Sequence, residues 1–307
     1  MGTLVRITLY APDESSARSA FAAAYARIAD LDRTLSDYNP QSELNRLCRE
    51  AWRRPVAVSA DLYTVLEASQ KLAAETGGAF DITLGPVILL SRQARQDGRM
   101  PAQQALERAR MLSGYQKLRL DPERHAVTLA AEGMHLDVGG IAKGYAADEA
   151  LAVLRSLGIP RALVAVSGDL AIGDAPPGTA GWRVGIGSGP AQPGGFARIL
   201  VIENTAVSTS GDSQQFVEIG GVRYSHIVDP RTGIGLRQSI AVTVIARRGI
   251  TADGLSTAVS VLGPDRGLQY LEEATDAAAL MTISTDSGTR VVASPRFERR
   301  FGRAATR

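Results

Sequence analysis

The sequence LDVGGIAKGY at residues 136–145 joins a short apolar run to a helical pattern through a pair of glycines. This order predicts the end of a strand, a tight turn at Gly139 and Gly140, and a helix over 141–157. A helix that begins behind glycines offers free backbone N–H groups to an anion. Lys143 falls in the first turn of this helix, where its charge opposes the helix dipole. We therefore expect either a bound anion beside Lys143 or an ordinary turn with a solvated lysine.

Helical and strand patterns follow one another on both sides of this turn without regular alternation. This irregular order disfavours a doubly wound parallel sheet and favours an α+β fold with mixed or antiparallel sheets flanked by helices. We expect helices over 13–38, 60–75, 102–111, 141–157 and 252–274, the last interrupted at Gly263-Pro264. We expect strands over 1–10, 116–120, 126–129, 134–136, 162–166, 182–186, 197–202, 215–219, 223–227, 240–246, 278–283 and 289–292. We predict a single domain over 1–295 and a frayed basic tail over 296–307.

The composition excludes several classes of protein. Of 307 residues, 45% are hydrophobic and 21% are charged, which is typical of a globular protein rather than a disordered one. The single cysteine, Cys48, can form no internal disulfide, and it excludes zinc and iron–sulfur sites built from several cysteines. A formal net charge of +2 is too small for the basic surface of a nucleic-acid-binding protein, so we expect no nucleic-acid partner.

The sequence also bears on the cellular compartment. It contains no run of about 20 apolar residues, so we expect no transmembrane helix. The first ten residues alternate like a strand and lack the charged and apolar regions of a secretory signal. We therefore expect a cytoplasmic protein from the sequence as written. If an N-terminal signal was trimmed from the natural chain, we expect a periplasmic or membrane-anchored protein instead.

Two further stretches contain more polar residues and glycines than a core requires. In GAFDITLGP at 78–86, Asp81 follows Phe80, so the segment either holds an aromatic ring beside a polar edge or uses Asp81 as a helix cap. In YSHIVDPRTG at 224–233, His226 ends an expected strand and precedes an Asp-Pro turn. A lone histidine of this kind is either structural or a catalytic candidate.

The stretch TADGLST at 251–257 separates Asp253 and Thr257 by four residues, which puts both on one face of a helix. A carboxylate and a hydroxyl are hard oxygen ligands that suit Mg²⁺ and do not suit zinc. The alternative is that this segment is only the capped start of a helix.

Taken in order, these stretches resemble one family, the FAD:protein FMN transferases or ApbE-like flavin transferases. The resemblance covers nearly the whole chain. Eight motifs carry it: 1–3 (MGT), 35–45 (LSDYNPQSELN), 79–86 (AFDITLGP), 137–145 (DVGGIAKGY), 167–169 (SGD), 209–212 (TSGD), 226–233 (HIVDPRTG) and 251–257 (TADGLST). Each motif is weak alone, whereas eight in order are a strong signal. The chain departs from the family pattern at the edges of the expected pocket, at Ile82, Ser91, Ser167 and Ser213.

The resemblance implies the ApbE-like flavin transferase fold and a specific reaction. Such enzymes bind FAD and Mg²⁺ and transfer the FMN half of FAD to a Thr or Ser hydroxyl of a flavin-accepting protein, releasing AMP. The residues that would line the flavin or adenine pockets are Met1, Tyr38, Ala79, Phe80 and Asp81. The residues that would contact FAD elsewhere are Asp137, Lys143 and, through the backbone, Ile227 or Val228.

The resemblance also implies a metal site and a base. The Gly140 carbonyl, Asp253 and Thr257 would hold the metal. His226 is the candidate base or proton relay, and Asp253 is the alternative base. Two other functions share the expected site. One is an FAD pyrophosphatase, which would split FAD to FMN and AMP with water as the nucleophile, and the other is a non-catalytic FAD-binding protein.

Overall fold

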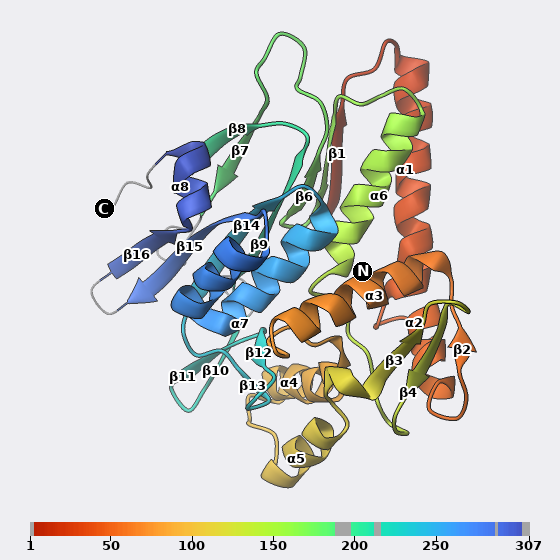
Figure 1. Cartoon of the computed structure of the whole chain (residues 1–307), viewed down its shortest axis with the longest axis vertical. Helices are drawn as coiled ribbons and strands as arrows, with labels where there is room; N and C mark the ends of the chain where they lie inside the picture. Colours follow the sequence, from red (N-terminus) through yellow and green to blue (C-terminus); the bar gives the residue numbers. More distant parts are fainter. Residues whose placement is uncertain (1–2, 188–197, 212–215, 286–287, 303–307) are drawn as a thin grey trace. The chain divides into compact units, whose positions relative to one another are not determined.

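A computed structural model gives the fold and describes residues 3–187, 198–211, 216–285 and 288–302 (Figure 1). Met1, Gly2 and Asp212, which belong to the sequence motifs, and Ser213, where the chain departs from the family pattern, lie outside the described residues. The chain separates into two compact units, each made of several segments. The helical unit comprises Met1, Leu31–Gly140 and Gln214–Gln238, and the sheet unit comprises Gly2–Asp30, Ile141–Ser213 and Ser239–Arg307. The single domain over 1–295 stays a prediction.

A seven-stranded sheet forms the centre of the sheet unit, and every neighbouring pair in it is antiparallel. In spatial order its strands are β1 (Val5–Leu9), β5 (Ala162–Val166), β6 (Asp169–Ile172), β9 (Thr205–Gly211), β14 (Ile240–Ala246), β15 (Ala278–Thr285) and β16 (Gly288–Ala293). All seven residues of β14 are buried, because this strand lies inside the sheet and both of its faces are covered.

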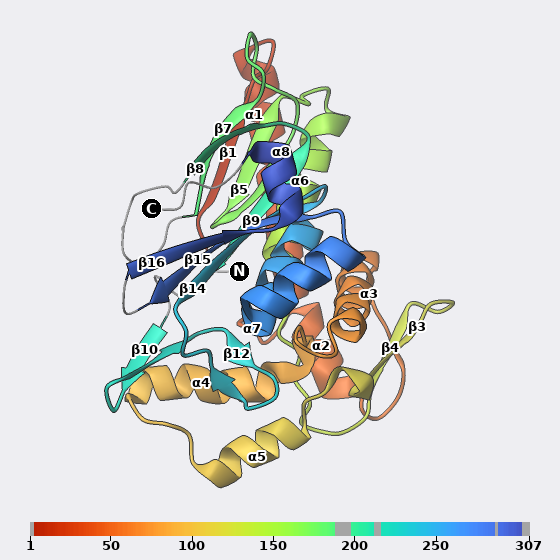
Figure 2. The same ribbon diagram turned by 60° about the vertical axis from the view of Figure 1, so that its left-hand side comes forward.

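Two helices, α6 (Ala142–Ser156) and α7 (Gly249–Ala274), pack against each other and against the central strands, as Figures 1 and 2 show. Helix α7 leaves helical geometry at Gly263, directly before Pro264, which confirms the expected interruption. A proline cannot continue the hydrogen-bond ladder of the preceding turn, so the chain kinks there.

A second apolar layer in the sheet unit contains the ribbon β7 (Trp182–Ile186) and β8 (Arg198–Ile202) together with α8 (Pro295–Phe301). Phe297 is fully buried in this layer with Trp182 and Leu280. The expectation of a frayed tail is therefore wrong for α8. The pattern is too short for helical periodicity to identify it, but Ser294 caps the helix and Pro295 occupies a first-turn position, where a proline is tolerated.

The helical unit contains four α-helices among its described residues: α2 (Glu43–Glu50), α3 (Ala60–Glu75), α4 (Gly85–Asp97) and α5 (Gln103–Met111). Helix α1 (Glu14–Leu35) begins in the sheet unit, and its last five residues belong to the helical unit. Short 3-10 turns form η1 (Ile82–Leu84) and η2 (Tyr115–Lys117). The small sheets are β2 (Val56–Ala57), β4 (Ala126–Leu129) and β3 (Leu118–Asp121); β10 (Phe216–Ile219) with β11 (Val222–Ser225); and β12 (Val228–Asp229) with β13 (Ile234–Gly235).

The structure confirms the α+β class, with antiparallel sheets. It adds elements that the sequence patterns missed, among them α2, α4, β6 and β9. Helix α4 was missed because Gly85-Pro86 suggests a turn, although both residues fit the start of a helix. The expected strand over 134–136 is absent, since these described residues have no regular secondary structure.

Candidate active site

The first turns of α6 and α7 approach each other closely because both carry a glycine at the crossing. A β-carbon on Gly144 would lie 2.1 Å from the carbonyl oxygen of Gly249, and one on Gly249 would lie 2.4 Å from the carbonyl oxygen of Gly144. No side chain fits in this space. The crossing places Lys143 of α6 beside Asp253 of α7.

Lys143 lies between two buried carboxylates. Its Nζ atom is 2.8 Å from Asp169 Oδ2 and 3.2 and 3.3 Å from the two carboxylate oxygens of Asp253. The backbone N–H of Gly144 also donates to Asp253 Oδ2, at 3.0 Å. The solvated-lysine alternative is therefore wrong, and the charge that opposes the helix dipole is balanced by the protein itself. The sequence patterns did not identify Asp169 as a partner of Lys143. Residues 167–169 match a family motif, but the resemblance assigns no role to Asp169.

The three charges perturb one another strongly. Burial and the negative charge of Asp169 raise the pKa of Asp253, Lys143 and the Gly144 N–H oppose both effects, and the resulting pKa is about 7. Burial lowers the pKa of Lys143, but the attraction of Asp253 and Asp169 outweighs burial and raises the pKa overall. When both carboxylates are ionised, they leave an excess of negative charge around the one ammonium, so the cluster can then accept a further cation.

Hydroxyl groups surround this cluster in the sheet unit. Ser208 donates to Asp169 Oδ1, and Ser256 Oγ lies 3.1 Å from Ser208 Oγ and 2.7 Å from Ser210 Oγ. Ser210 Oγ in turn lies 3.3 Å from Thr257 Oγ1. Thr257 is one turn after Asp253 on α7, as the spacing predicts. The donors are all hard oxygens, which fits Mg²⁺ better than a soft metal.

The predicted metal ligands belong to both units. Asp253 and Thr257 lie in the sheet unit, whereas Gly140 lies in the helical unit. That the Gly140 carbonyl contributes to a metal site therefore stays a prediction. Among the residues that the structure describes, no group of three or more His, Cys, Asp or Glu side chains could hold a metal ion. The predicted set contains a single carboxylate, so it relies on other oxygens to complete the coordination shell.

In the helical unit, Arg92 joins two of the predicted FAD contacts. Its guanidinium pairs with Asp37 at 2.5 Å and with Asp137 at 2.7 Å, and it lies 4.3 Å from the ring centroid of Tyr38. Tyr38 is 69% exposed, so one face of its ring stays available although the other contacts Arg92. Arg92 was not predicted as a site residue, because the sequence patterns did not identify α4.

The segment 79–81 leads into the short turn η1. Asp81 caps this turn by accepting from the backbone N–H of Thr83 at 2.8 Å and from the Thr83 hydroxyl at 2.6 Å, so the capping alternative is confirmed. Burial raises the pKa of Asp81, and the bonds from Thr83 oppose this effect. Phe80 is 3% exposed and Ala79 is partly exposed. Their contribution to a flavin pocket stays a prediction.

His226 lies between β11 and β12 and is half-buried. The two residues after it, Ile227 and Val228, are buried, and the Ile227 N–H donates to Ser225 Oγ at 3.1 Å. The nearby Asp229 accepts two bonds from the Arg231 guanidinium, at 3.0 and 2.8 Å. The ion pair between Asp229 and Arg231 therefore stabilises the turn that follows His226.

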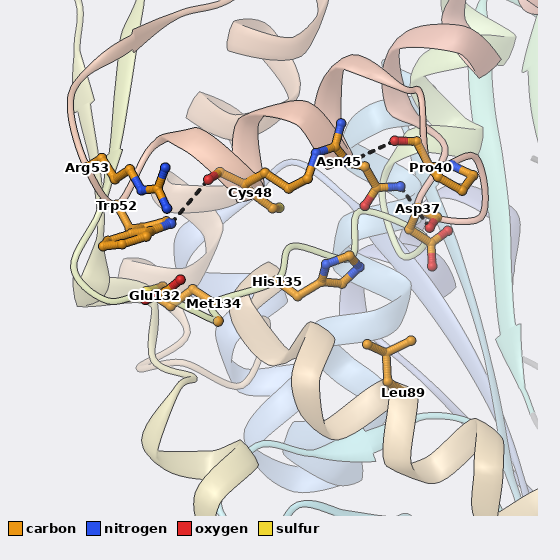
Figure 3. A pocket seen from close by; sticks show the side chains of 12 residues that line it. Asp37, Pro40, Asn45, Cys48, Trp52, Arg53, Leu89, Glu132, Met134 and His135 are labelled. Carbon is orange, nitrogen blue, oxygen red and sulfur yellow. Dashed lines mark hydrogen bonds between the residues drawn. The ribbon is translucent and has the colours of Figure 1, made fainter.

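A pocket of about 780 Å³ opens in the helical unit beside Asp37 (Figure 3). The His135 ring extends into it, and Cys48, Trp52 and Leu89 contribute to its wall. Burial lowers the pKa of His135 and raises the pKa of Cys48 to about 11. The Cys48 thiol is therefore protonated near neutral pH and is not a nucleophile.

The sequence matches the model of the ApbE family over residues 1–281. The chain belongs to the ApbE family. Two curated relatives are each called "FAD:protein FMN transferase". The protein from Klebsiella pneumoniae is 32% identical over 306 residues, covering 97% of this chain and 86% of the relative. The protein from Vibrio cholerae is 31% identical over 275 residues, covering 88% and 81%.

Solved structures of the ApbE family match the whole fold. The flavin transferase ApbE from Vibrio cholerae is 30% identical, with a TM-score of 0.88 over 97% of this chain and 96% of that one. The apo form of the Pseudomonas stutzeri flavinyl transferase ApbE is also 30% identical, with a TM-score of 0.87 over 99% and 95%. In the described part of this ApbE-family chain, no helix has both the length and the apolar composition to cross a bilayer.

Proposed function

We propose that this chain is a magnesium-dependent FAD:protein FMN transferase that attaches FMN to a Thr or Ser hydroxyl of an acceptor protein. The observation that carries the proposal is the buried cluster of Lys143, Asp169 and Asp253 with its surrounding hydroxyls, in a chain whose relatives bear that name. The cluster combines excess negative charge with hard oxygen donors. That combination suits a divalent cation next to a pyrophosphate.

The reaction exchanges one phosphorus–oxygen bond for another. The acceptor hydroxyl oxygen forms a bond to the phosphorus of the FMN half, and the bond from that phosphorus to the AMP phosphate breaks. AMP leaves with the electron pair, and the hydroxyl proton passes to a base. Bound Mg²⁺ would supply charge neutralisation on the pyrophosphate, worth several kcal/mol.

Within this proposal Asp253 and Thr257 hold the cation, with the Gly140 carbonyl as a third ligand. Lys143 adds a fixed positive charge whose position depends on Asp169 and Asp253. Met1, Tyr38 and the segment 79–81 line the flavin or adenine pockets. Asp137 and the backbone at Ile227 or Val228 make further contacts to FAD. Arg92 supports this binding because it contacts both Tyr38 and Asp137.

His226 is the better candidate for the base. Both carboxylate oxygens of Asp253 lie within 3.3 Å of the Lys143 ammonium, and one also accepts from the Gly144 N–H. A carboxylate held in this way is suited to binding a cation rather than to abstracting a proton. A positioned imidazole contributes about 10²–10⁴-fold as a general base.

Mass spectrometry tests the proposal. The chain is mixed with FAD, Mg²⁺ and a flavin-accepting domain, and the products are analysed for protein mass and for AMP. An FMN adduct on the acceptor together with AMP supports the transferase. Free FMN and AMP without an adduct indicate an FAD pyrophosphatase, and unchanged FAD indicates a binding protein, so either result contradicts the proposal.

A further inference from the structure

The Lys143 ammonium contacts two carboxylates whose surroundings differ. Asp253 Oδ2 accepts from the Gly144 N–H at 3.0 Å as well as from the ammonium. Asp253 Oδ1 has the ammonium, at 3.2 Å, as its only hydrogen-bond partner among the described residues. Asp169 presents Oδ2 to the ammonium at 2.8 Å and accepts from the Ser208 hydroxyl at Oδ1. Each carboxylate therefore keeps one contact that does not depend on the lysine.

Of the three charged groups, the ammonium is the one that can move most easily. Asp169 lies on β6, between β5 and β9 in the sheet, and is 2% exposed. Asp253 lies on α7 and is 1% exposed. Lys143 carries its ammonium on a flexible four-carbon stem with three rotatable donors. The two carboxylates therefore form a fixed frame within which the ammonium can change partners.

A cation bound by Asp253 needs an oxygen that Lys143 contacts. Two positive charges at one carboxylate repel each other, so the ammonium and the predicted cation compete for Asp253. An ammonium that is mostly buried and loses its anionic partner is strongly destabilised. Asp169 prevents this loss, because it offers the same ammonium a second carboxylate at 2.8 Å.

We propose that Asp169 is a positioning residue that retains the Lys143 ammonium when the Asp253 carboxylate binds the cation. The lysine then keeps its positive charge inside the site. When both carboxylates are ionised, they leave a single excess positive charge with the ammonium and a divalent cation, which suits an anionic pyrophosphate. This inference rests on the proposed function, because it assigns how the charges of the chain accommodate the predicted magnesium.

Binding of Mn²⁺ alone to the full chain tests this role by electron paramagnetic resonance, since Mn²⁺ takes the same oxygen ligands as Mg²⁺. Asp169→Asn keeps the size of the side chain but removes its charge, so the ammonium depends on Asp253 alone. We expect the Mn²⁺ dissociation constant to rise about tenfold or more, as for other groups that support metal ligands. Wild-type affinity in Asp169→Asn overturns the proposal, and so does a wild-type chain that binds no Mn²⁺.

A second background shows whether Asp169 acts through Lys143. Lys143→Met removes the competing charge and keeps an unbranched side chain. In that background Asp169→Asn should weaken Mn²⁺ binding much less, because no ammonium is left to retain. Comparison within each background separates this coupling from the direct effect of losing the lysine charge. An equal loss in both backgrounds means that Asp169 attracts or binds the cation directly, which overturns the positioning role.

Thr243→Val is the matched control for the loss of a buried hydrogen bond. Thr243 is fully buried on β14 of the same sheet, and its hydroxyl pairs with Thr209 at 2.9 Å. The substitution leaves all three charges in place, so its Mn²⁺ affinity should equal that of the wild type. A loss in Thr243→Val equal to that in Asp169→Asn overturns the proposal, because general loosening of the sheet would then explain both.

Nuclear magnetic resonance of the lysines supplies a readout that does not require Lys143→Met to fold. The chain has three lysines, Lys71, Lys117 and Lys143, so labelling lysine Cε with ¹³C gives three signals. Lys71→Arg and Lys117→Arg identify two of them, and both residues lie in the helical unit and should not respond to Mg²⁺.

Saturating Mg²⁺ should shift the Lys143 signal of the wild type while its side chain stays rigid, because Asp169 still holds the ammonium. In Asp169→Asn the same addition should make this side chain mobile and narrow its signal. A Lys143 signal that Mg²⁺ does not shift in the wild type shows that the ammonium keeps its contact with Asp253, which overturns the proposal.

The positioning role and the transferase proposal can fail separately. A chain that transfers FMN but has the same Mn²⁺ affinity with and without Asp169→Asn overturns the positioning role and leaves the transferase intact. A chain that gives the expected Mn²⁺ and lysine responses without transferring FMN supports the role of Asp169 and overturns the transferase.

Discussion

Lys143 lies closer to Asp169, at 2.8 Å, than to Asp253, at 3.2 Å. Asp253 contacts the ammonium through both of its oxygens, whereas Asp169 contacts it through one oxygen and accepts from the Ser208 hydroxyl at the other. Asp253 therefore shares its lysine with a second carboxylate. A carboxylate in that position can exchange part of its contact with Lys143 for contact with a cation.

The glycine contact between α6 and α7 is the first feature that mutation can test. We predict that Gly144→Ala destabilises the protein by about 1–3 kcal/mol, the usual cost of overpacking, because the new methyl group would meet the Gly249 carbonyl. Urea unfolding measures this loss. Gly168→Ala is the control, since a β-carbon there would meet its nearest neighbour at 3.6 Å, and its effect should stay within about 0.5 kcal/mol.

Arg92 offers a second test, in the helical unit. Arg92→Ala leaves Asp37 and Asp137 without their shared partner and removes the contact beneath Tyr38. We predict a loss of stability of about 3 kcal/mol, typical of a broken ion pair that is mostly buried, and weaker FAD binding by fluorescence titration. Arg92→Lys should recover little, because a lysine cannot bridge two carboxylates with separate nitrogens and also stack on a ring. FAD affinity equal to wild type in both variants would separate Arg92 from flavin binding.

Much of this arrangement was accessible from the sequence, and the failures have physical causes. The spacing of Asp253 and Thr257 predicted that both lie on one face of a helix. The pair Gly263-Pro264 predicted the kink in α7. Strand β9 was missed because it is rich in Ser and Thr, whose hydroxyls are buried by pairing with one another and with Asp169. Such pairing depends on residues about 40 positions apart and leaves no local signal.

The partners of individual charges were the hardest part to predict. The pattern around Lys143 indicated a missing negative charge but gave no means to choose between a ligand and a distant carboxylate. The choice depends on the register of β6 and on the glycine crossing, both of which are tertiary features. Arg92 and Asp37 show the same limit, since their pairing spans α4 and the segment before α2.

Cys48 gives a prediction on pH. Its thiol is buried, and burial raises its pKa to about 11, above the value of about 8.5 for an exposed thiol. The native state therefore holds the proton longer than the unfolded state, and stability falls as pH rises between these two values. We predict that Cys48→Ala removes this fall, which amounts to about 3 kcal/mol over the full range, as measured by urea unfolding of the variant and the wild type. Rapid alkylation of native Cys48 near neutral pH would contradict its assignment as an inert thiol.

His226 is tested by its titration during transfer. If it is the base, the transfer rate should rise with pH through an inflection at about 6–7.5, the range in which an imidazole titrates. His226→Asn should remove the inflection and slow transfer about 10²-fold or more, while FAD still binds. An asparagine preserves a hydrogen bond but cannot titrate. An unshifted inflection in the variant would assign the titrating group elsewhere.

The Asp253 carboxyl predicts how the stability of the protein depends on pH and on bound metal. Burial raises its pKa to about 7, whereas an unfolded chain has a value of about 3.9 for aspartate. Between these values the native state binds more protons than the unfolded state, so the metal-free protein should lose stability as pH rises from about 4 to about 7. Asp253→Asn cannot titrate, and we expect it to flatten this slope, removing on the order of 2–4 kcal/mol of the pH dependence.

Magnesium should reverse the trend in the wild type, because the cation binds the ionised carboxylate and competes with its proton. The rise in melting temperature on adding Mg²⁺ should therefore grow with pH in the wild type and be absent in Asp253→Asn, together with Mg²⁺-dependent AMP release. Thr243→Val, which leaves every charge in place, should follow the wild type. If Asp253→Asn keeps both the pH slope and the response to Mg²⁺, the carboxylate that titrates and binds the metal is not Asp253.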